Sequence, residues 1–411
     1  MTISILAPIT QSEFIEDTTH GIHVNELPIW AHHPLPFFSE VAVSFLHSFS
    51  RMLMQDKACK NVSELVALAF WLRQANINTY RPKASEHYYK ALGTLVHFTP
   101  SNVDTMFVYS WACALLAGNK SIIRVSSRDS NVQRQLFKIL NELLQKSEYQ
   151  EISRTNLFIT YDHSSPLGSQ ITHHLCGKAD GRVLWGGDKS VNTLRAIPCS
   201  PRCRDISFAD RVSISVIAAD AVRTDKDAYT ALHGLLTSVQ VYNQQACSSP
   251  RMLFWVGDSD NLDRFLSRLH SDEMIKLSNQ YEPVITRRNE QLVAAQSLQL
   301  SHPSARVNYY ADLCAIELEE IGSEDLRFHS GHQVMLCQCV SSLDSIATYI
   351  TPNVQTLSYF GVSKAALIKF IEAPSITGID RIVPLSEALN FAPEWDGYEL
   401  FSQMARRVVI K

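Results

Sequence analysis

The spacing of apolar residues alternates between strand-like runs and helical periodicity along much of the chain. One clear unit begins with an apolar run over 92–98, continues with helical apolar spacing over 103–117 and ends with a short apolar run over 121–125. This order predicts a strand, a helix and a second strand parallel to the first. Gly118 and Asn119, which follow the helical stretch, are typical of a helix C-terminus.

The same alternation continues beyond this unit. Ser130 precedes a stretch over 131–145 whose apolar residues share one helical face, which predicts a capped amphipathic helix. Short apolar runs at 156–160 and 182–184 predict further strands. Strands that alternate with helices over 90–220 indicate an α/β fold with a doubly wound sheet. Such sheets bind ligands at the carboxyl ends of their strands.

Length and charge narrow the class of protein. The chain has 411 residues, which favours two domains, and its formal charge of -4 results from 37 basic and 41 acidic residues. This balance disfavours nucleic acid and anionic membrane surfaces as partners. Residues 1–14 lack both the basic start of an export signal and an apolar run long enough to span a bilayer. We therefore expect a soluble, cytoplasmic protein that acts on small molecules.

The cysteines form an odd set of nine without the spacing of a disulfide framework, so reduced thiols are expected. Cys199 and Cys203, and likewise Cys337 and Cys339, lack the spacing of a zinc site, and we expect no metal.

One cysteine has a distinctive position. Cys247 lies within 242–250 (YNQQACSSP), after a helical pattern over 228–241 and before a buried strand over 252–256. A cysteine on such a connection can point into a cleft. Its surroundings are rich in amides and uncharged, which suits a nucleophile that attacks a carbonyl group. A small buried apolar side chain is the alternative interpretation.

Four motifs follow one another along the chain in a characteristic order. They are 99–102 (TPSN), 116–127 (LAGNKSIIRVSS), 185–187 (WGG) and 244–250 (QQACSSP). This order resembles the aldehyde dehydrogenase superfamily. Together with 378–389 (GIDRIVPLSEAL) and 395–398 (WDGY), the motifs are similar, more narrowly, to the fatty acyl reductase family of bacterial luminescence. The resemblance covers about residues 85–411.

The resemblance implies roles for single residues. Cys247 matches the nucleophile of the superfamily, and Asn102 matches the asparagine whose side-chain amide stabilises the oxyanion. A helix N-cap before Val103 is a compatible alternative role for Asn102.

The resemblance also implies a nicotinamide cofactor. Arg124 occupies the position of a lysine that contacts the adenosine ribose in most members, and Ser127 that of a glutamate in many NAD-preferring members. The lost carboxylate and the presence of Arg124 or Arg128 favour NADPH over NADH, although the arginines could also be a solvated strand end. The residues expected to bind the cofactor are Thr99, Pro100, Arg124, Ser126, Ser127, Arg128, Gly186 and Gly187.

Two departures from the superfamily affect the chemistry. The glutamate that activates the deacylating water would fall near Ser207, where no carboxylate stands, so hydrolysis of an acyl-enzyme should be poorly supported. A second glutamate, which holds the nicotinamide ribose, would fall within 327–332, where none is found. His329 or His332 could donate a proton there, or could simply be solvated.

We therefore expect an aldehyde dehydrogenase-like α/β fold with a Rossmann-type nucleotide-binding domain over 1–210 and a catalytic domain over 211–385. A C-terminal segment over 386–411 should return to the interface of a homo-oligomer, either a dimer or a tetramer. The active site should lie in the cleft between the domains.

The expected reaction is the NADPH-dependent reduction of acyl-CoA, or of a carrier-bound acyl group, to an aldehyde through an acyl-enzyme on Cys247. An acyl-protein synthetase is a candidate partner. Three alternatives stay open: an aldehyde dehydrogenase that works in the oxidative direction, a cofactor-free cysteine acyltransferase, and a non-enzymatic subunit of an acyl-processing assembly.

Overall fold

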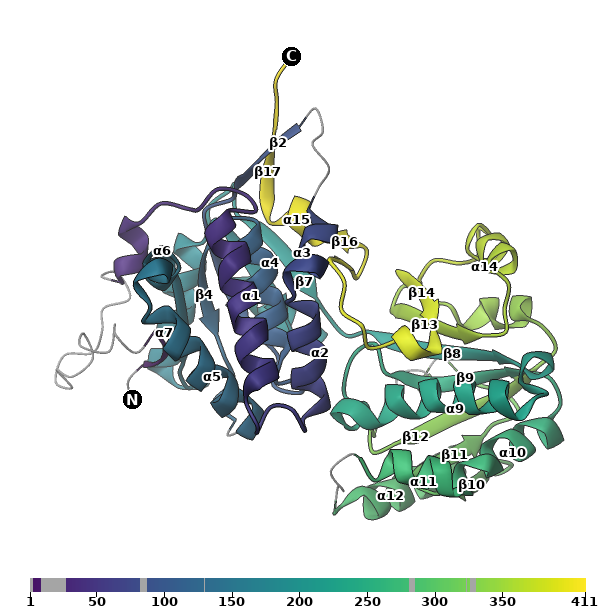
Figure 1. Ribbon diagram of the computed structural model, residues 1–411. Helices are drawn as coiled ribbons and strands as arrows, with labels where there is room; N and C mark the ends of the chain where they lie inside the picture. Colours follow the sequence, from purple (N-terminus) through teal and green to yellow (C-terminus); the bar gives the residue numbers. More distant parts are fainter. Residues whose placement is uncertain are drawn as a thin grey trace. The chain divides into compact units, whose positions relative to one another are not determined.

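The structure is a computed structural model that describes residues 3–8, 27–81, 87–128, 130–280, 285–322, 324–325 and 330–411. Its internal contacts divide the chain into two units (Figure 1). Unit 1 comprises Met1–Ala209 and Phe391–Lys411, and unit 2 comprises Asp210–Asn390. The roles assigned above to two domains and a C-terminal segment remain predictions.

Unit 1 contains a six-stranded sheet in the order β1-β5-β4-β3-β6-β7. Its strands are β1 (Ser4–Ala7), β3 (Thr94–Phe98), β4 (Lys120–Arg124), β5 (Asn156–Thr160), β6 (Gly181–Trp185) and β7 (Arg204–Phe208). Only the edge strand β1 runs antiparallel to its neighbour. After β5 the chain crosses to the far side of β3, so the strand order reverses between β3 and β6. Ligands of doubly wound sheets bind at such a reversal.

Helices cover both faces of this sheet. Leu175 and Val191, from the helices after β5 and β6, pack with Leu184 in one core cluster. On the opposite face Trp111 forms an edge contact with Phe158 at 5.0 Å. The helices of unit 1 are α1 (Glu40–Gln55), α2 (Ser63–Trp71), α3 (Gln74–Tyr80), α4 (Met106–Leu116), α5 (Asn131–Leu144), α6 (Gln150–Thr155), α7 (Pro166–Lys178), α8 (Asp188–Arg195) and α15 (Leu400–Gln403).

The elements predicted from apolar spacing between residues 92 and 184 are confirmed, with shifts of a few residues at their ends. Ser130 caps α5 as expected, because its hydroxyl accepts a hydrogen bond from the backbone N–H of Gln133 at 3.3 Å. Gly118 follows α4 with a φ of 84°, a left-handed conformation that glycine adopts without a steric penalty. The predicted start of α4 at Val103 is wrong, since the helix begins at Met106.

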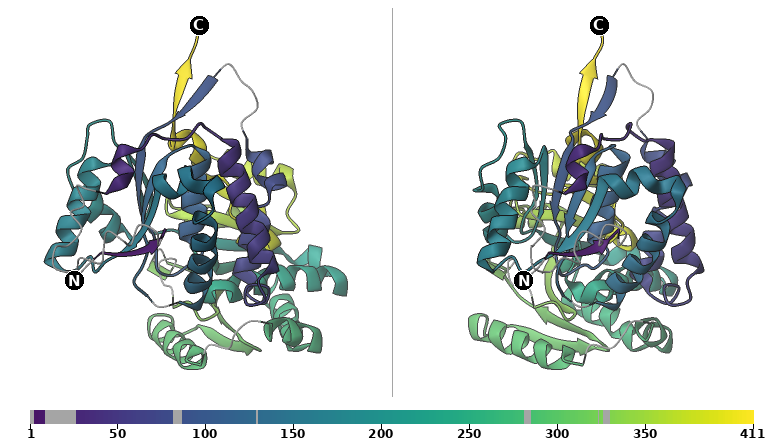
Figure 2. Two further views of the ribbon diagram at one scale, coloured as in Figure 1. Left: turned by 60° about the vertical axis from the view of Figure 1, so that its left-hand side comes forward. Right: turned by 90° about the vertical axis from the view of Figure 1, so that its left-hand side faces the viewer.

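The C-terminal segment of the chain is anchored within unit 1. Arg204 donates through Nη1 to the carbonyl oxygens of Ser402, Gln403 and Ala405 at 3.3, 3.1 and 2.8 Å. The short strands β15 (Glu394–Trp395) and β16 (Tyr398–Glu399) pair with each other. The final strand β17 (Ala405–Val409) pairs antiparallel with β2 (His87–Ala91), and Figure 2 shows these two strands side by side.

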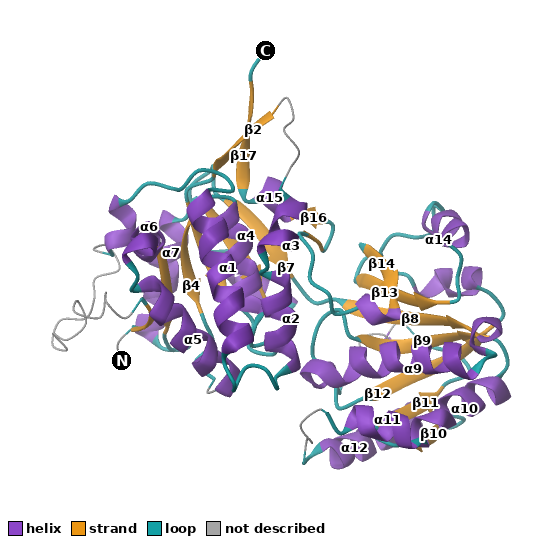
Figure 3. Ribbon diagram, viewed as in Figure 1, coloured by secondary structure: helices purple, strands orange, loops and turns teal. Residues whose placement is uncertain are grey.

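Unit 2 contains a seven-stranded sheet in the order β10-β11-β12-β9-β8-β13-β14 (Figure 3). Strands β10 and β11 are antiparallel, and the other neighbouring strands are parallel. The strands are β8 (Val212–Ala218), β9 (Pro250–Val256), β10 (Arg306–Tyr310), β11 (Leu313–Glu317), β12 (Val334–Val340), β13 (Val354–Phe360) and β14 (Arg381–Pro384). The α-helices are α9 (Asp225–Gln240), α10 (Ser259–Ser267), α11 (Asp272–Ser278), α12 (Arg287–Ser301) and α14 (Lys364–Ile371).

Both faces of this second sheet are buried. Phe254 belongs to a core cluster with residues of α12 and α14, whereas its neighbours Leu253 and Trp255 belong to a cluster with residues of α9 and α10. Burial of alternate side chains on opposite faces is typical of a parallel sheet. In the described ranges, no helix combines the length and apolar composition that crossing a bilayer requires.

Candidate active site

The backbone before Cys247 has an uncommon conformation. Between α9 and β9, the 3-10 helix η6 (Val241–Gln244) contains three successive residues with positive φ: Tyr242 at 56°, Asn243 at 50° and Gln244 at 62°. Residues other than glycine seldom adopt a positive φ, and three in succession persist only where surrounding contacts hold them. Conformations of this kind cluster at functional sites, which makes this loop the first candidate for chemistry.

A second loop with the same backbone feature holds the first. Residues 331–333 all have positive φ, from 55° to 68°. The backbone N–H of His332 donates to the Asn243 carbonyl oxygen at 3.3 Å, and the Asn243 side-chain nitrogen lies 3.1 Å from Nδ1 of His332. Gln291, on α12, donates to the His332 carbonyl oxygen at 2.8 Å. His332, predicted as a possible proton donor, thus contacts Asn243; His329 lies outside the described residues.

Close packing adds to the hydrogen bonds between the loops. The fully buried Gln244 donates through Nε2 to the carbonyl oxygens of Pro250 and Val334, both at 2.9 Å. A Cβ added to Gly331 would lie 2.1 Å from Nε2 of Gln245. Another residue at position 331 would force the Gln245 side chain to move and would have to adopt a φ of 68°, so glycine suits this close approach. The connection that carries Cys247 is thus held by contacts with the start of β9 and with the second loop and β12.

Cys247 is neither fully buried nor fully exposed, and it interacts with a nearby cation. Cys247 is half-buried, and its carbonyl oxygen accepts a hydrogen bond from the Ser213 hydroxyl at 2.7 Å. Burial lowers the pKa of Arg251, while the negative charges of Asp210 and of an ionised Cys247 raise it. The same attraction stabilises the thiolate, which is the nucleophilic form of cysteine.

Most other cysteines are poorly suited to nucleophilic attack. Burial raises the pKa of the thiols of Cys59, Cys113, Cys176, Cys203, Cys314, Cys337 and Cys339. These side chains stay protonated at neutral pH and behave as small apolar residues.

Replacing Arg251 by methionine should move the pH profile of Cys247 alkylation to higher pH. Without the guanidinium the thiolate loses a favourable charge interaction, so the ionised fraction at a given pH falls. The rate of iodoacetamide labelling at Cys247, followed by peptide mass spectrometry from pH 6 to 10, measures the shift. Arg264→Met, which changes an exposed arginine on α10, is the matched control. Coincident profiles for all three proteins would rule out this role of Arg251.

Unit 1 contains the residues that are predicted to bind a cofactor. The ladder between β3 and β6 ends at Phe98. Beyond it the backbone N–H of Thr99 bonds to the Arg124 carbonyl oxygen at 3.2 Å, whereas the N–H of Gly186 bonds to the Phe208 carbonyl oxygen at 3.1 Å. After β3 and β6, the two segments therefore hydrogen-bond to different neighbouring strands, β4 and β7, at the point where the strand order reverses. A doubly wound sheet offers its ligand site there.

The predicted cofactor residues lie at the carboxyl ends of these strands. Thr99 and Pro100 directly follow β3, and Arg124 ends β4. Gly186 has a φ of 155°, which an L-residue rarely adopts, and Gly187 is the N-cap of α8. The other three predicted residues, Ser126, Ser127 and Arg128, follow β4. Their roles in binding remain predictions.

Arg124 is held in a defined position. Its Nη2 lies 2.9 Å from Nδ1 of His163, and its guanidinium carbon lies 5.8 Å from the ring centroid of Tyr161. Burial lowers its pKa, and the charges of Tyr161 and Asp162 oppose that shift. Its Nε atom is buried without a hydrogen-bond partner in the described part of the chain. A buried, unpaired donor at this edge fits an anionic ligand such as a nucleotide phosphate. His163 was missed in the sequence, although its place after the strand at 156–160 was a signal.

The loop that contains Asn102 is tied to α5. Asp104 accepts hydrogen bonds from the Ser130 hydroxyl at 2.5 Å and from the Gln133 side chain at 3.1 Å. The N-cap residue of α4 is Thr105, three residues after Asn102. Asn102 is exposed and belongs to unit 1, whereas Cys247 belongs to unit 2. Its role toward the oxyanion remains a prediction.

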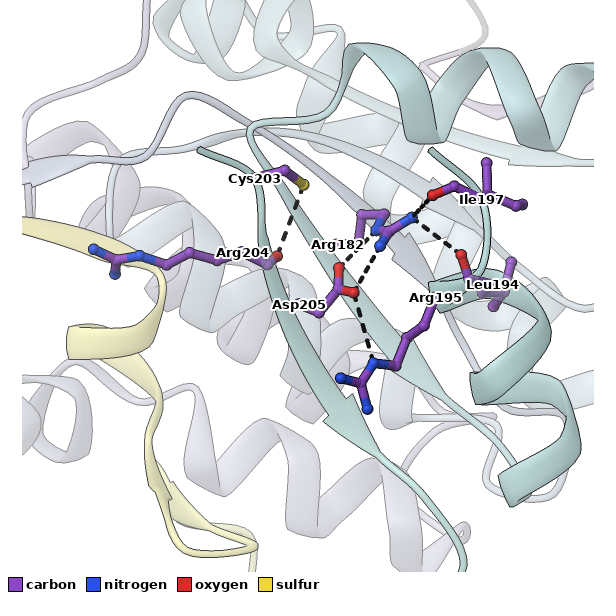
Figure 4. A network of polar contacts seen from close by, with 7 residues as sticks. All are labelled: Arg182, Leu194, Arg195, Ile197, Cys203, Arg204 and Asp205. Atoms are coloured by element: carbon purple, nitrogen blue, oxygen red, sulfur yellow. Dashed lines mark hydrogen bonds and ion pairs between the residues drawn. The ribbon is translucent and has the colours of Figure 1, made fainter. Parts of the chain in front are cut away.

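The carboxylate nearest to Ser207 in the sequence of β7, that of Asp205, is already engaged. Arg182, which is fully buried, holds both oxygens of Asp205 at 2.6 Å (Figure 4). The same guanidinium donates to the carbonyl oxygens of Leu194 and Ile197 at 3.0 and 2.9 Å. Both oxygens of the Asp205 carboxylate are therefore engaged by one arginine. Among the described residues, no cluster of three or more His, Cys, Asp or Glu is arranged to hold a metal ion.

Solved structures with a similar fold are aldehyde dehydrogenases. A 1-pyrroline-5-carboxylate dehydrogenase from Thermus with bound NAD matches with a TM-score of 0.65 at 12% identity, over 89% of this chain and 80% of that one. The glyceraldehyde-3-phosphate dehydrogenase GapN from Methanocaldococcus jannaschii, complexed with NADP, matches with a TM-score of 0.62 at 13% identity, over 98% and 92%. The predicted aldehyde dehydrogenase-like α/β fold is confirmed.

Residues 35–407 match the acyl-CoA reductase (LuxC) family, and the chain belongs to that family. A long-chain acyl-protein thioester reductase 2 from Photobacterium leiognathi is 31% identical over 52% of this chain and 42% of its own length. A long-chain acyl-protein thioester reductase from Aliivibrio fischeri is 26% identical over 71% and 58%. The chain thus spans about half the length of the curated relatives it matches.

Proposed function

We propose that this protein reduces an acyl thioester to an aldehyde through an acyl-enzyme on Cys247, with NADPH as reductant. The observation that carries the proposal is the left-handed run at 242–244, fastened by the loop at 331–333, directly before Cys247 in a member of the LuxC family. A half-buried thiol near Arg251 suits attack on a thioester carbonyl. The names of the relatives support a thioester of a long acyl chain as substrate.

The mechanism assigns each step to a residue of this chain. The Cys247 thiolate attacks the thioester carbonyl, and the Asn102 amide together with the Cys247 backbone N–H stabilises the tetrahedral oxyanion. One such donor is typically worth about 2.7–4 kcal/mol in kcat. Expulsion of the carrier thiol leaves the acyl group as a thioester on Cys247. The cofactor supplies a hydride when bound. Collapse of the resulting hemithioacetal releases the aldehyde and restores the Cys247 thiol.

The residues at the carboxyl ends of β3, β4 and β6 would hold the cofactor. Gly187 offers a backbone N–H group at the start of α8, a place that suits a phosphate, whereas the Gly186 N–H is already bonded to the Phe208 carbonyl oxygen. Arg124, with its unpaired Nε in the described part of unit 1, would take the 2'-phosphate, and Ser127 brings no carboxylate that would repel it. These features favour NADPH over NADH.

The same proposal includes the carrier and the assembly. The acyl group would come from CoA or from a protein thiol, and an acyl-protein synthetase would be the partner that loads it. We further propose a cytoplasmic homo-oligomer, either a dimer or a tetramer. The names of the relatives support only a thioester as substrate.

Incubation with acyl-CoAs of several chain lengths in the absence of NADPH tests the function. Intact-protein mass spectrometry should show one acyl adduct per chain, and addition of NADPH should release an aldehyde. An adduct without any nicotinamide nucleotide binding would favour a cysteine acyltransferase. Formation of a carboxylic acid from an aldehyde and NAD(P), without CoA, would favour an oxidative dehydrogenase. The absence of any adduct would contradict the proposal.

Ser207→Glu should shorten the lifetime of the acyl-enzyme. Position 207 lacks a carboxylate and Asp205 is bound by Arg182, so no base on β7 is available to deprotonate an attacking water. A glutamate there should raise hydrolysis. The measurement is decay of the acyl adduct without cofactor, by mass spectrometry, with Ser207→Gln as the uncharged control. Fast hydrolysis by the unmodified protein, or unchanged decay in a folded Ser207→Glu protein, would refute this explanation.

A further inference from the structure

A buried polar chain connects three elements of unit 1. The hydroxyl of Ser110, on α4, lies 2.8 Å from Nδ1 of His97, on β3. The same hydroxyl accepts a hydrogen bond from Nε1 of Trp185, the last residue of β6, at 3.2 Å. His97 and Ser110 are fully buried, and Trp185 is 8% exposed. Every residue of α4 is buried, and Ser110 is a polar residue within this largely apolar helix.

Packing alone does not explain the hydrogen-bonded set of His97, Ser110 and Trp185. Nε2 of His97 is buried and has no hydrogen-bond partner among the residues that the structure describes. A buried polar atom left unpaired costs about 1–3 kcal/mol. Burial also lowers the pKa of His97 to about 3, so the ring is neutral at any physiological pH. An apolar side chain at position 97 would avoid the cost, which suggests that the contact with Ser110 has a purpose.

The place of these three residues in the sheet indicates what their hydrogen bonds do. His97 and Trp185 lie at the ends of β3 and β6, where the two strands stop pairing with each other. Trp185 is followed directly by Gly186 and Gly187. Its ring stacks on Phe208 at 3.7 Å between centroids and 12° between planes. Stacking leaves the indole able to slide in its plane, whereas a hydrogen bond from Nε1 fixes that position.

We propose that Ser110 is a positioning residue for the candidate cofactor site: by holding the indole of Trp185, its hydroxyl sets the place of the Gly186–Gly187 turn. The inference rests on the cofactor part of the proposed function. Ser110 acts through Trp185 and is not expected to touch the cofactor. His97, the second partner of the hydroxyl, holds Ser110 in the orientation that accepts from the indole.

Ser110→Ala should weaken NADPH binding about tenfold, because the indole of Trp185 loses the hydrogen bond that fixes its position and, with it, that of the Gly186–Gly187 turn. Binding is measured from the fluorescence of the reduced nicotinamide in protein that carries no acyl group. Acyl-CoA labelling of Cys247, which needs no cofactor, should stay unchanged. Ser121→Ala is the matched control, because Ser121 is fully buried on β4 and its hydroxyl has no partner within the described ranges. It should bind NADPH as the unmodified protein does.

A double-mutant cycle separates positioning from general stability. If Ser110 acts through Trp185, Ser110→Ala combined with Trp185→Phe should bind NADPH no more weakly than the weaker single variant. Losses in affinity that multiply, or unaltered NADPH binding by Ser110→Ala, would overturn the inference. If Ser110→Ala fails to fold, Trp185→Phe alone still tests it, since unaltered binding by that variant overturns it too. Failure of the unmodified protein to bind NADPH would instead reject the proposed cofactor.

Discussion

Cys247→Ala should abolish covalent labelling by acyl-CoA, although eight other cysteines remain. Burial raises the pKa of most of those thiols, so they present little thiolate to a thioester. Cys247→Ser should label slowly at best, because a hydroxyl is mostly protonated near neutrality and needs a base that β9 and its preceding loop do not supply in their sequence. Intact mass after incubation without NADPH measures both outcomes.

Cys199→Ala is the control for this experiment. Cys199 is half-buried like Cys247, but it follows α8 in unit 1, whereas Cys247 belongs to unit 2. Its replacement should leave labelling unchanged, and peptide mapping should place the acyl group on Cys247 in the control. An adduct of full intensity on the Cys247→Ala protein would show that another residue carries the acyl group, and the proposed mechanism would then fail at its first step.

Much of the fold could be predicted because local patterns in this chain agree with tertiary structure. The run at 156–160 coincides with β5, and the amphipathic stretch after Ser130 is α5 to within one residue. Such elements bury one clear face or lie wholly inside a parallel sheet, so periodicity is informative. The predicted start of α4 was wrong because Val103 extends the apolar pattern, although residues 103–105 precede the helix.

The detailed geometry of the candidate site could not be predicted in the same way. A left-handed run is not expected for Tyr242 and Gln244, although asparagine adopts this conformation more readily than most residues. Long-range contacts of Asn243 with His332 and of Gln244 with the Val334 carbonyl oxygen hold the run. Gly331 was a usable signal, since a glycine in a polar loop often permits close approach. The bond between Arg124 and His163 depends on strand order, which periodicity does not reveal.

Buried polar contacts were equally hidden in the sequence. Arg182 and Asp205 occupy neighbouring strands, and their pairing follows from the register of β6 against β7. Ser110 was recognisable as one hydroxyl within an apolar helix, yet its partners His97 and Trp185 come from strands 13 and 75 residues away. Positions that break an apolar pattern mark where such contacts lie, while the structure identifies the partners.

Asn102→Ala should lower kcat about a hundredfold or more, with NADPH affinity nearly unchanged. The side-chain amide is expected to act only as negative charge develops on the acyl oxygen, so its loss affects the transition state rather than the ground state. If only stability fell, by roughly the 1 kcal/mol of a lost helix cap, the alternative in which Asn102 caps a helix would be favoured. Steady-state kinetics, NADPH titration and thermal unfolding measure the three quantities.

Ser101→Ala provides the comparison for this variant. Ser101 is the exposed neighbour of Asn102, and the loop contact it makes with Arg128 uses its backbone carbonyl oxygen at 3.2 Å, which alanine retains. It should therefore keep nearly full kcat. Asn102→Asp should be at least as impaired as Asn102→Ala, since a carboxylate would repel the oxyanion instead of donating to it. Similar kcat values for Asn102→Ala and Ser101→Ala would mean that the oxyanion is stabilised elsewhere, by the Cys247 backbone N–H alone or by a group of the second unit.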